Sequence, residues 1–452
     1  MASANSICKR ILNVKGVVVE STQFYTDSDQ ITHLMISARP DKWHQCLCPL
    51  CNKKCPKDGP SVQGRIWRGL DFGSTVFEII GDTQRINCPE HGRIVASVPW
   101  AYPGSKFTRN FDLTAGWLAV YLPKSVVAEY MRIDWDTVGR CISRTLHEIE
   151  PDRKKRLDNL VNIAIDETSY KKGHKYITVI LNHDTNTVVW ASVGYGKAVL
   201  EKFFRELTPE QLESIKVVTG DGAKWITDCV DEFIPKSERC IDAFHVVEWA
   251  MEAMEEVKRE IWRELYAEAK DLKKDISADG DEKAKKDQVQ KAKLIKDQAD
   301  KIKGSKYALG KAPEHLTDNQ KSHLEWIANE SPVLYRAYQM KESIRLILKM
   351  DSIEEAEPLL KKWLWKASHS RIPAFVELSR KIRRHKKHIF NTIRLGFSNA
   401  RLESTNNKIK LLIRKSYGFR NTDNMLDLIY LVCSDLVIPL PNRSQVTAKA
   451  CA

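Results

Sequence analysis

The segment from Leu160 to His245 restricts the possible folds most, because its hydrophobic pattern changes type in a definite order. Three apolar runs, NIAID, KYITVILNH and TVVWASVGY, read as strands and are joined by short polar turns. A helical pattern, a strand-like run, a second helical pattern and a final short strand follow. Hairpin-linked strands followed by alternating helices and strands predict a mixed sheet flanked by helices.

Two carboxylates lie where strands of this sheet are expected to end. Asp166 closes the run NIAID, and strand alternation places it on the face of Ala164, opposite its isoleucine neighbours. Asp221 follows the apolar run KVVT and lies between two glycines, at an expected tight strand-to-helix turn. If the first and fourth strands are neighbours, as in a ribonuclease-H-like sheet, the two carboxylates could hold Mg²⁺ ions for phosphoryl displacement.

A third carboxylate would complete such a site, and the helical run SNARLESTNNKIKLLIRK supplies Glu403. Two amides and a lysine share its helix face, because their spacing is three to four residues or a multiple of it. These are Asn399, Asn407 and Lys410. Taken singly, Asp166 could merely end a buried strand and Glu403 could be a solvated helix residue. Alternation turns Glu167 to the other face of the sheet, as a bystander.

Five of the eleven cysteines fall in one short N-terminal stretch, which indicates local use of thiolates. Because the count is odd and the chain shows no secretion signal, we expect no disulfide framework. A C-x2-C and a C-x2-H pair have the spacing of two zinc knuckles, and four ligands make the zinc structural, not catalytic. The predicted ligands are Cys48, Cys51, Cys88 and His91. Cys46 and Cys55 lie nearby and leave the ligand set open, as does the alternative of reduced cysteines without metal.

Residues 107–150 have the pattern of three short helices and the size of a helix-turn-helix. Its last helix, DWDTVGRCISRTLHEI, would enter a major groove with Arg140 and Arg144 on its polar side. Other three-helix bundles have a similar pattern, and the pattern alone does not establish DNA binding. The neighbouring zinc motif and the net charge of +13 are the further observations that support this interpretation. A basic surplus of this size favours a nucleic acid, because neutralised phosphates release counterions.

Membrane binding is the competing explanation of the charge. No apolar run approaches the roughly 20 residues of a spanning helix, and the first residues lack the apolar core of a signal peptide. We therefore expect a soluble, cytoplasmic protein without a membrane partner.

Taken in order, the two knuckles, the helix-turn-helix and the motifs AIDE, TGDG, DAFH and NARLESTNNKIK resemble the IS-L-three family of bacterial insertion-sequence transposases. The resemblance covers almost the whole chain and is most specific at the three acidic motifs. It implies a D-D-E triad of Asp166, Asp221 and Glu403 that holds two Mg²⁺ or Mn²⁺ ions. A D-x2-H signature of related families makes Asp242 and His245 further site candidates, although His245 could be a core histidine.

The resemblance also explains the Glu- and Lys-rich helical segment after His245, as an insertion ahead of the helix that carries Glu403. The expected fold class is a multidomain protein with α+β and α/β parts: a β-rich zinc domain, a helix-turn-helix and a ribonuclease-H-like mixed sheet interrupted by an all-α insertion. The expected domains are 1–105, 106–155, 156–245, 246–394 and 395–452, of which the third and fifth form the catalytic domain.

The function implied by the resemblance is that of a DNA transposase, nucleoid-associated in a bacterium. The knuckles and the helix-turn-helix would bind terminal inverted repeats, and the D-D-E site would cleave a strand and join its 3′-OH to target DNA. Basic residues around the last motif would contact the DNA backbone: Lys408, Lys410, Arg414 and Lys415. Holding two ends requires a homodimer or a larger assembly. A transposase-derived DNA-binding regulator without catalysis and a nuclease without strand transfer remain alternatives.

Overall fold

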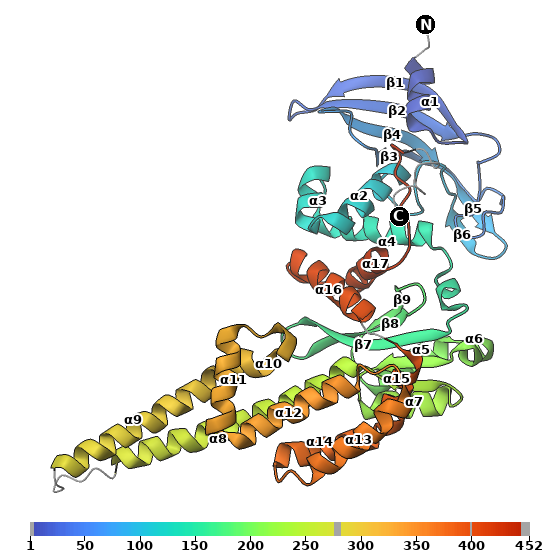
Figure 1. Cartoon of the computed structure of the whole chain (residues 1–452). Coiled ribbons are helices and arrows are strands. Elements are labelled where there is room, and N and C mark those ends of the chain that lie inside the picture. Colours follow the sequence, from blue (N-terminus) through green and yellow to red (C-terminus); the bar gives the residue numbers. More distant parts are fainter. Residues whose placement is uncertain (1–3, 275–281, 398–399, 444–452) are drawn as a thin grey trace. The chain divides into compact units, whose positions relative to one another are not determined.

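The computed structural model describes residues 4–274, 282–397 and 400–443 (Figure 1). The chain divides into two compact units, Met1–Arg156 with Lys408–Ala452, and Leu157–Asn407. Within the described residues, no helix has the length and apolar character needed to cross a membrane.

A four-stranded sheet begins the first unit, in the order β1-β2-β4-β3. Its strands are β1 (Val17–Thr26), β2 (Thr32–Pro40), β3 (Val62–Arg68) and β4 (Val76–Thr83). Helix α1 (Ala4–Leu12) packs on this sheet, and its buried residues share one core with Trp67 and Trp100. The two tryptophan rings meet edge to face at 5.3 Å, a favoured aromatic geometry.

A hairpin and three helices complete the N-terminal part of this unit. They are β5 (Arg85–Cys88), β6 (Gly92–Val95), α2 (Arg109–Tyr121), α3 (Lys124–Met131) and α4 (Trp135–Ile149). The last helix of the chain, α17 (Thr422–Cys433), packs against α4, where Asp427 accepts hydrogen bonds from Ser143 and from Arg153. A short 3-10 helix, Arg153–Leu157, follows α4.

The second unit is built around a five-stranded mixed sheet. Its strands are β7 (Asn162–Lys171), β8 (Lys175–Asn182), β9 (Thr187–Val193), β10 (Val217–Gly220) and β11 (Glu238–Ile241). Their order is β11-β10-β7-β8-β9; β8 runs antiparallel to both its neighbours, and β10 runs parallel to β7 and to β11. The first and fourth strands are therefore neighbours, and their carboxyl ends point the same way.

Three helices accompany this sheet: α5 (Lys197–Glu206), α6 (Pro209–Ser214) and α7 (Lys224–Phe233). Ile163 and Ile165 of β7 share one core with Phe203 of α5 and Ile226 of α7. Because successive strand residues alternate between faces, the face opposite α5 and α7 is left for Asp166.

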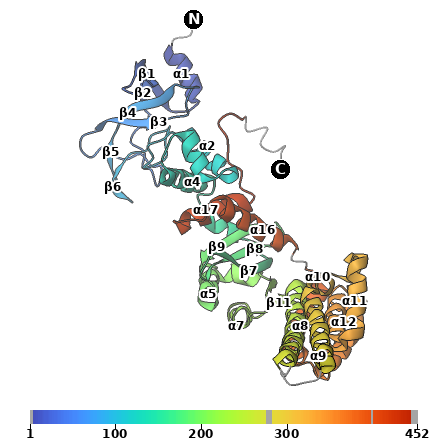
Figure 2. The same cartoon turned by 90° about the vertical axis from the view of Figure 1, so that its left-hand side faces the viewer.

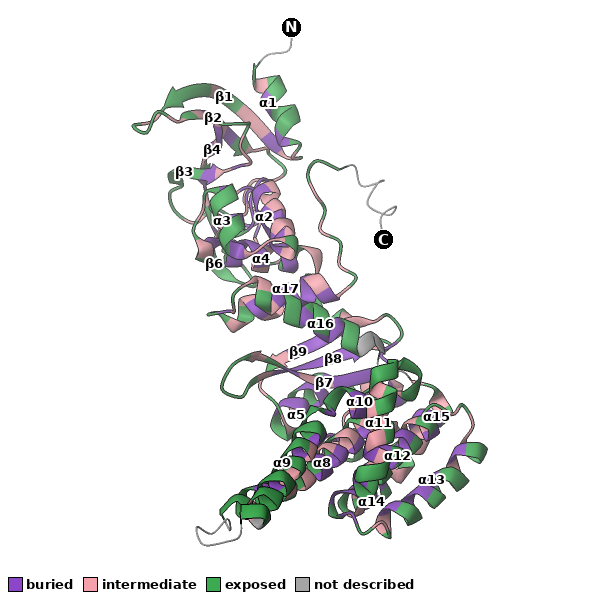
Figure 3. Ribbon diagram, turned by 60° about the vertical axis from the view of Figure 1, so that its left-hand side comes forward, coloured by how far each residue is buried: buried purple, intermediate pink, exposed green. Residues whose placement is uncertain are grey.

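Residues 243–274 and 282–395 are mainly helical, as the charged composition of this segment predicts. The helices are α8 (Ala243–Lys274), α9 (Glu282–Gly304), α10 (Lys306–Gly310), α11 (Asp318–Glu330), α12 (Pro332–Ile347), α13 (Ile353–Ser368), α14 (Pro373–Arg384) and α15 (Lys386–Leu395), with a 3-10 turn at Pro313–His315. The long helices α8 and α9 run side by side (Figures 1 and 2), and most of α9 is exposed (Figure 3).

Helix α15 attaches this helical segment to the edge of the sheet. The Asn391 amide donates to the carbonyl of Arg239 at 3.0 Å, and the Thr392 hydroxyl donates to that of Ile241 at 2.6 Å. Helix α16 (Ala400–Lys415) follows and carries the motif with Glu403.

Candidate functional site

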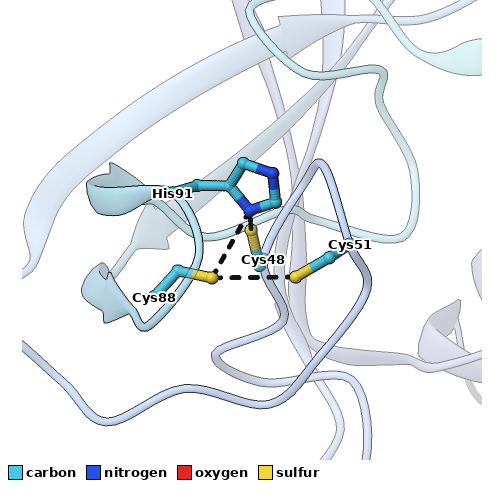
Figure 4. A group of neighbouring side chains, drawn as sticks. All are labelled: Cys48, Cys51, Cys88 and His91. Carbon is cyan, nitrogen blue, oxygen red and sulfur yellow. Dashed lines mark hydrogen bonds between the residues drawn. The ribbon is translucent and has the colours of Figure 1, made fainter.

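Four side chains of the N-terminal unit converge with the spacing of a zinc site (Figure 4). They are Cys48, Cys51, Cys88 and His91, whose ligand atoms all lie within 4.8 Å of one another. The Sγ atoms of Cys51 and Cys88 are 3.6 Å apart, and Cys88 Sγ lies 3.5 Å from His91 Nδ1. Zinc–sulfur bonds of about 2.3 Å in a tetrahedron separate two sulfurs by about 3.8 Å. The donor set and its distances therefore fit Zn²⁺.

The pKa values of these thiols distinguish a predicted ligand, Cys88, from a neighbouring cysteine, Cys55. Burial raises the pKa of Cys88, but hydrogen bonds from the backbone N–H groups of Glu90 and His91 outweigh it and lower the pKa to about 7. Burial and nearby thiols raise the pKa of Cys55, whose S–H group donates to the carbonyl of Lys53 at 3.3 Å. Cys55 therefore acts as a buried thiol, and neither it nor Cys46 belongs to the converging group.

The helix-turn-helix contains an internal ion pair. Arg144 of α4 donates to the fully buried carboxylate of Asp112 of α2, from Nε at 3.0 Å and from Nη2 at 2.7 Å. Asp112 also accepts from the Ser105 hydroxyl at 2.9 Å. Arg144 thus holds α4 on α2, where the sequence predicted a side chain free to contact DNA. Arg140 is exposed and donates to the Thr137 hydroxyl at 2.7 Å.

A basic cavity of about 470 Å³ opens beside the start of α4. Five of its lining residues are cationic: Arg68, Lys106, Arg132, Arg140 and Arg144. Asp71 pairs with two of them, Arg68 at 3.0 Å and Arg132 at 2.6 Å.

Asp166 lies half-buried within β7, which continues to Lys171, and not at the end of the strand as the sequence predicted. Its side chain is on the face away from α5 and α7. Its Oδ1 accepts from the backbone N–H of Glu167 at 2.7 Å, and its Oδ2 accepts from the amide of Asn406 on α16. Burial raises the pKa of Asp166, and the negative charge of Asp221 acts in the same direction. A positive charge on His245 would act in the opposite direction.

Asp221 lies directly after β10, as the sequence predicted. Its Oδ1 accepts from the backbone N–H of Ala223 at 2.9 Å, which fixes the turn into α7. Arg239, only 3% exposed on β11, donates to the carbonyl oxygens of Asp221, Cys240 and Val218. Next to Asp221, a Cβ atom added to Gly222 would lie 2.4 Å from the ring of Trp249, so α8 packs tightly against this turn.

The other predicted site candidates have identifiable contacts. Asp242 is buried at the start of α8 and accepts from the backbone N–H of Phe244 at 3.0 Å, which is the contact of an N-terminal cap. His245 is half-buried, with Nδ1 3.1 Å from a carboxylate oxygen of Glu248.

Helix α16 presents the remaining candidates. Glu403 and Asn407 are exposed, whereas Asn406 is buried between Asp166 and the Thr168 hydroxyl, 3.5 Å away. Asn399 lies outside the described residues. Lys408, Lys410 and Arg414 are exposed, while Lys415 donates to the carbonyl of Val120 at 2.7 Å. Among the described residues, no group that includes these acids brings three ligand atoms as close together as the cysteine cluster does.

Comparison with known proteins identifies the chain. The helix-turn-helix domain of transposase family ISL3 matches residues 96–145, and a transposase model of the same family matches residues 163–429. The chain belongs to the ISL3 transposase family. The resemblance to the IS-L-three family that the motifs indicate is thus confirmed, and Asp166, Asp221 and Glu403 all lie within the transposase match.

Individual relatives give the same result. The transposases for insertion sequence element IS1557 from two strains of Mycobacterium tuberculosis are 38% identical over 434 residues, 95% of either chain. The transposase for insertion sequence element IS1001 from Bordetella parapertussis is 23% identical over 381 residues, 83% of this chain and 86% of its own. This ISL3 transposase therefore has a DNA-binding helix-turn-helix and a DDE transposase domain.

Two residues near the acids escaped the sequence argument. Asn406 was missed because it lies one position before the predicted Asn407, and only the rotation of α16 decides which amide faces β7. Arg239 was missed because an arginine inside a short strand suggests a surface position. Glu167 lies on the α5 side, as alternation predicts, and accepts from the backbone N–H of Gly196 at 3.0 Å.

Proposed function

We propose that this ISL3 transposase binds the terminal inverted repeats of its insertion sequence, cleaves the strands at the element ends and joins them to target DNA. The site would consist of Asp166, Asp221 and Glu403. The observation that supports it most is the position of the first two carboxylates on neighbouring parallel strands: Asp166 lies within β7, Asp221 directly follows β10, and each is two residues beyond the pair Ala164–Thr219.

The strand order also supports a ribonuclease-H-like assignment. In the second unit, three antiparallel strands are followed by two strands that add in parallel beside the first, β10 and then β11. The segment 246–394 would then be an insertion between the last strand and α16. The proposed division of the whole chain remains 1–105, 106–155, 156–245, 246–394 and 395–452.

The oxygen donors of Asp166 and Asp221 fit a hard divalent cation such as Mg²⁺ or Mn²⁺. When bound, two such ions would activate the attacking oxygen and stabilise charge on the phosphate. The side chains of the protein would act as fixed ligands and not as general acids. The side-chain amide of Asn406 would orient the carboxylate of Asp166. The guanidinium of Arg239 would hold the turn at Asp221 by donating to the backbone carbonyl oxygen of Asp221.

DNA recognition would come from the first unit. Arg140 and the basic cavity beside α4 would bind phosphates, with Arg144 keeping α4 in position on α2. The zinc knuckles would hold the hairpin β5–β6 in place, and the exposed Lys408, Lys410 and Arg414 would add backbone contacts on α16. Asp242 and His245 would lie at the margin of the site. We further propose that a homodimer or larger assembly holds the two ends.

A cleavage and joining assay on DNA that carries the element's own ends tests this function. Asp166→Asn and Glu403→Gln should reduce both products to background in Mg²⁺ or Mn²⁺, while end binding persists. Glu167→Gln is the matched control, because it changes an adjacent carboxylate that faces α5 and should leave both products in place. Wild-type protein that binds its ends but neither nicks nor joins them would indicate a regulator, and nicking without joining would indicate a nuclease.

A further inference from the structure

An apolar groove lies between α12 and α13 in the helical segment, in a part of the chain that holds none of the acidic motifs. Its volume is about 620 Å³. Three large apolar side chains that line it are strongly exposed: Leu346 (54%), Leu359 (41%) and Trp365 (62%). A cluster of exposed apolar side chains around a groove indicates an interaction site, whereas single apolar residues scattered over a surface do not.

Trp365 is held in a defined orientation. Its ring stacks on the imidazole of His369, with 4.8 Å between the ring centroids and 23° between the planes. His369 Nδ1 in turn lies 2.9 Å from the carbonyl oxygen of Trp365, one helical turn earlier. Because the imidazole covers one face of the indole, the ring is braced while much of it stays open to solvent.

The rim of the groove is basic. Arg336, Lys362 and Lys366 line it and are exposed, and within the described part of the chain none of the three forms an ion pair. No aspartate or glutamate lines the groove. Some other lysines of this segment are paired, as Lys361 is with Glu357 at 3.2 Å. The absence of acids on the rim leaves a positive potential around an aromatic surface.

We propose that this groove binds an unpaired nucleotide of the DNA substrate, with the base stacked on Trp365 and the flanking phosphates on Arg336, Lys362 and Lys366. An aromatic platform combined with a basic rim is the arrangement by which proteins bind single strands, because every base has an apolar face and every linkage a charge. Paired duplex DNA offers phosphates to the lysines, but its stacked bases offer nothing to an apolar groove of this size.

The charge of the rim distinguishes this occupant from a protein helix. An apolar helix would fill the groove without using three unpaired cations, and burying them would carry a desolvation cost. A nucleotide uses both features at once. The proposal rests on DNA being the substrate, but it does not require that the acidic site be active.

The test measures DNA affinity of the full-length protein without Mg²⁺ or Mn²⁺, by fluorescence anisotropy of a labelled oligothymidylate and of a labelled random duplex. Trp365→Ala should weaken single-strand binding about tenfold and leave duplex binding within twofold. Trp365→Phe should retain most of the single-strand affinity. The double variant Lys362→Gln/Lys366→Gln should make the plot of log affinity against log salt concentration less steep for the single strand. The slope should change by roughly 0.7 per lysine.

Matched controls lie on the same helical segment. Tyr307 of α10 is an aromatic residue of similar exposure, at 67%, and Lys291 and Lys293 are exposed on α9. Tyr307→Ala and Lys291→Gln/Lys293→Gln should leave the preference for single strands unchanged. Equal affinity of Trp365→Ala and wild type for the oligothymidylate would overturn the proposal.

The proposal would also be overturned if Trp365→Ala kept the single-strand affinity of wild type but had a different sedimentation coefficient. That result would assign the groove to contacts between copies of the protein. Asp166→Asn separates this proposal from the proposed function, because that variant should lose cleavage but bind single strands like wild type. If wild type fails to cleave while Trp365→Ala still loses single-strand binding, the groove proposal stands without the catalytic one.

Discussion

The two candidate metal sites differ in how far the protein alone assembles them. At the cysteine cluster, four ligand atoms from two tight turns lie within 4.8 Å of one another. At the acidic site, the carboxylates come from β7, from the turn after β10 and from α16, far apart in sequence, and Glu403 is exposed. A closed, preassembled shell suits a structural ion, whereas ions that act on a substrate need open coordination positions.

The first prediction concerns removal of a zinc ligand, which should have the largest effect. Cys88→Ser should abolish zinc binding and unfold the knuckles, because apparent binding free energies of structural zinc reach about 10–16 kcal/mol. Zinc content by atomic absorption and binding to terminal-repeat DNA should both fall. Cys55→Ser should keep a full equivalent of zinc, and a loss there would show that the ligand set is wrong.

The second prediction concerns the support of the acidic site. Arg239→Met removes the guanidinium that donates to three backbone carbonyl oxygens, including that of Asp221. Unsatisfied buried carbonyls should lower the free energy of unfolding by roughly 1–3 kcal/mol, and the turn that carries Asp221 should loosen. Urea unfolding measures the first effect, and the Mn²⁺ concentration needed for half-maximal cleavage measures the second. An unchanged metal requirement would mean that Arg239 supports only the fold.

The third prediction concerns Asn406, whose amide donates to Asp166. Asn406→Ala removes a group that orients a candidate metal ligand, and such changes typically cost about 10- to 100-fold in metal affinity or activity. Asn407→Ala, at the exposed neighbouring position, serves as the control in the same cleavage assay. If the two variants behave alike, the orienting role belongs to neither amide.

The smallest expected effect concerns pH. Burial lowers the pKa of His385 to about 4, and the positive charge of neighbouring His388 and Arg384 acts in the same direction. The unfolded chain therefore binds more protons than the folded one between about pH 4 and the ordinary histidine value of about 6.5, so stability should fall as pH drops through that window. His385→Asn should flatten the dependence of urea midpoint on pH there, without affecting zinc content. An identical slope in both proteins would refute the assignment.

The sequence predicts local features of this molecule well and long-range contacts poorly. The knuckle spacing identifies four side chains that do converge, and strand alternation places Asp166 and Glu167 on opposite faces. Arg144 could not be assigned from sequence, because its partner Asp112 lies 32 residues away on another helix. The choice between Asn406 and Asn407 depends on a rotation of about 100° per helical residue, which only packing fixes. The exposure of Trp365 likewise depends on which side of α13 packs into the core.

The attachment of α15 to β11 affects which truncations of the chain would stay monomeric. β11 is one of the two edge strands of its sheet, and side chains of α15 cover two of its carbonyl oxygens. His388 and Asn391 contact that of Arg239, and Thr392 contacts that of Ile241. Uncovered edge strands recruit other chains by strand addition. A shortened version that lacks the helical segment would expose this edge and should polymerise, so the segment also acts as a built-in guard against aggregation.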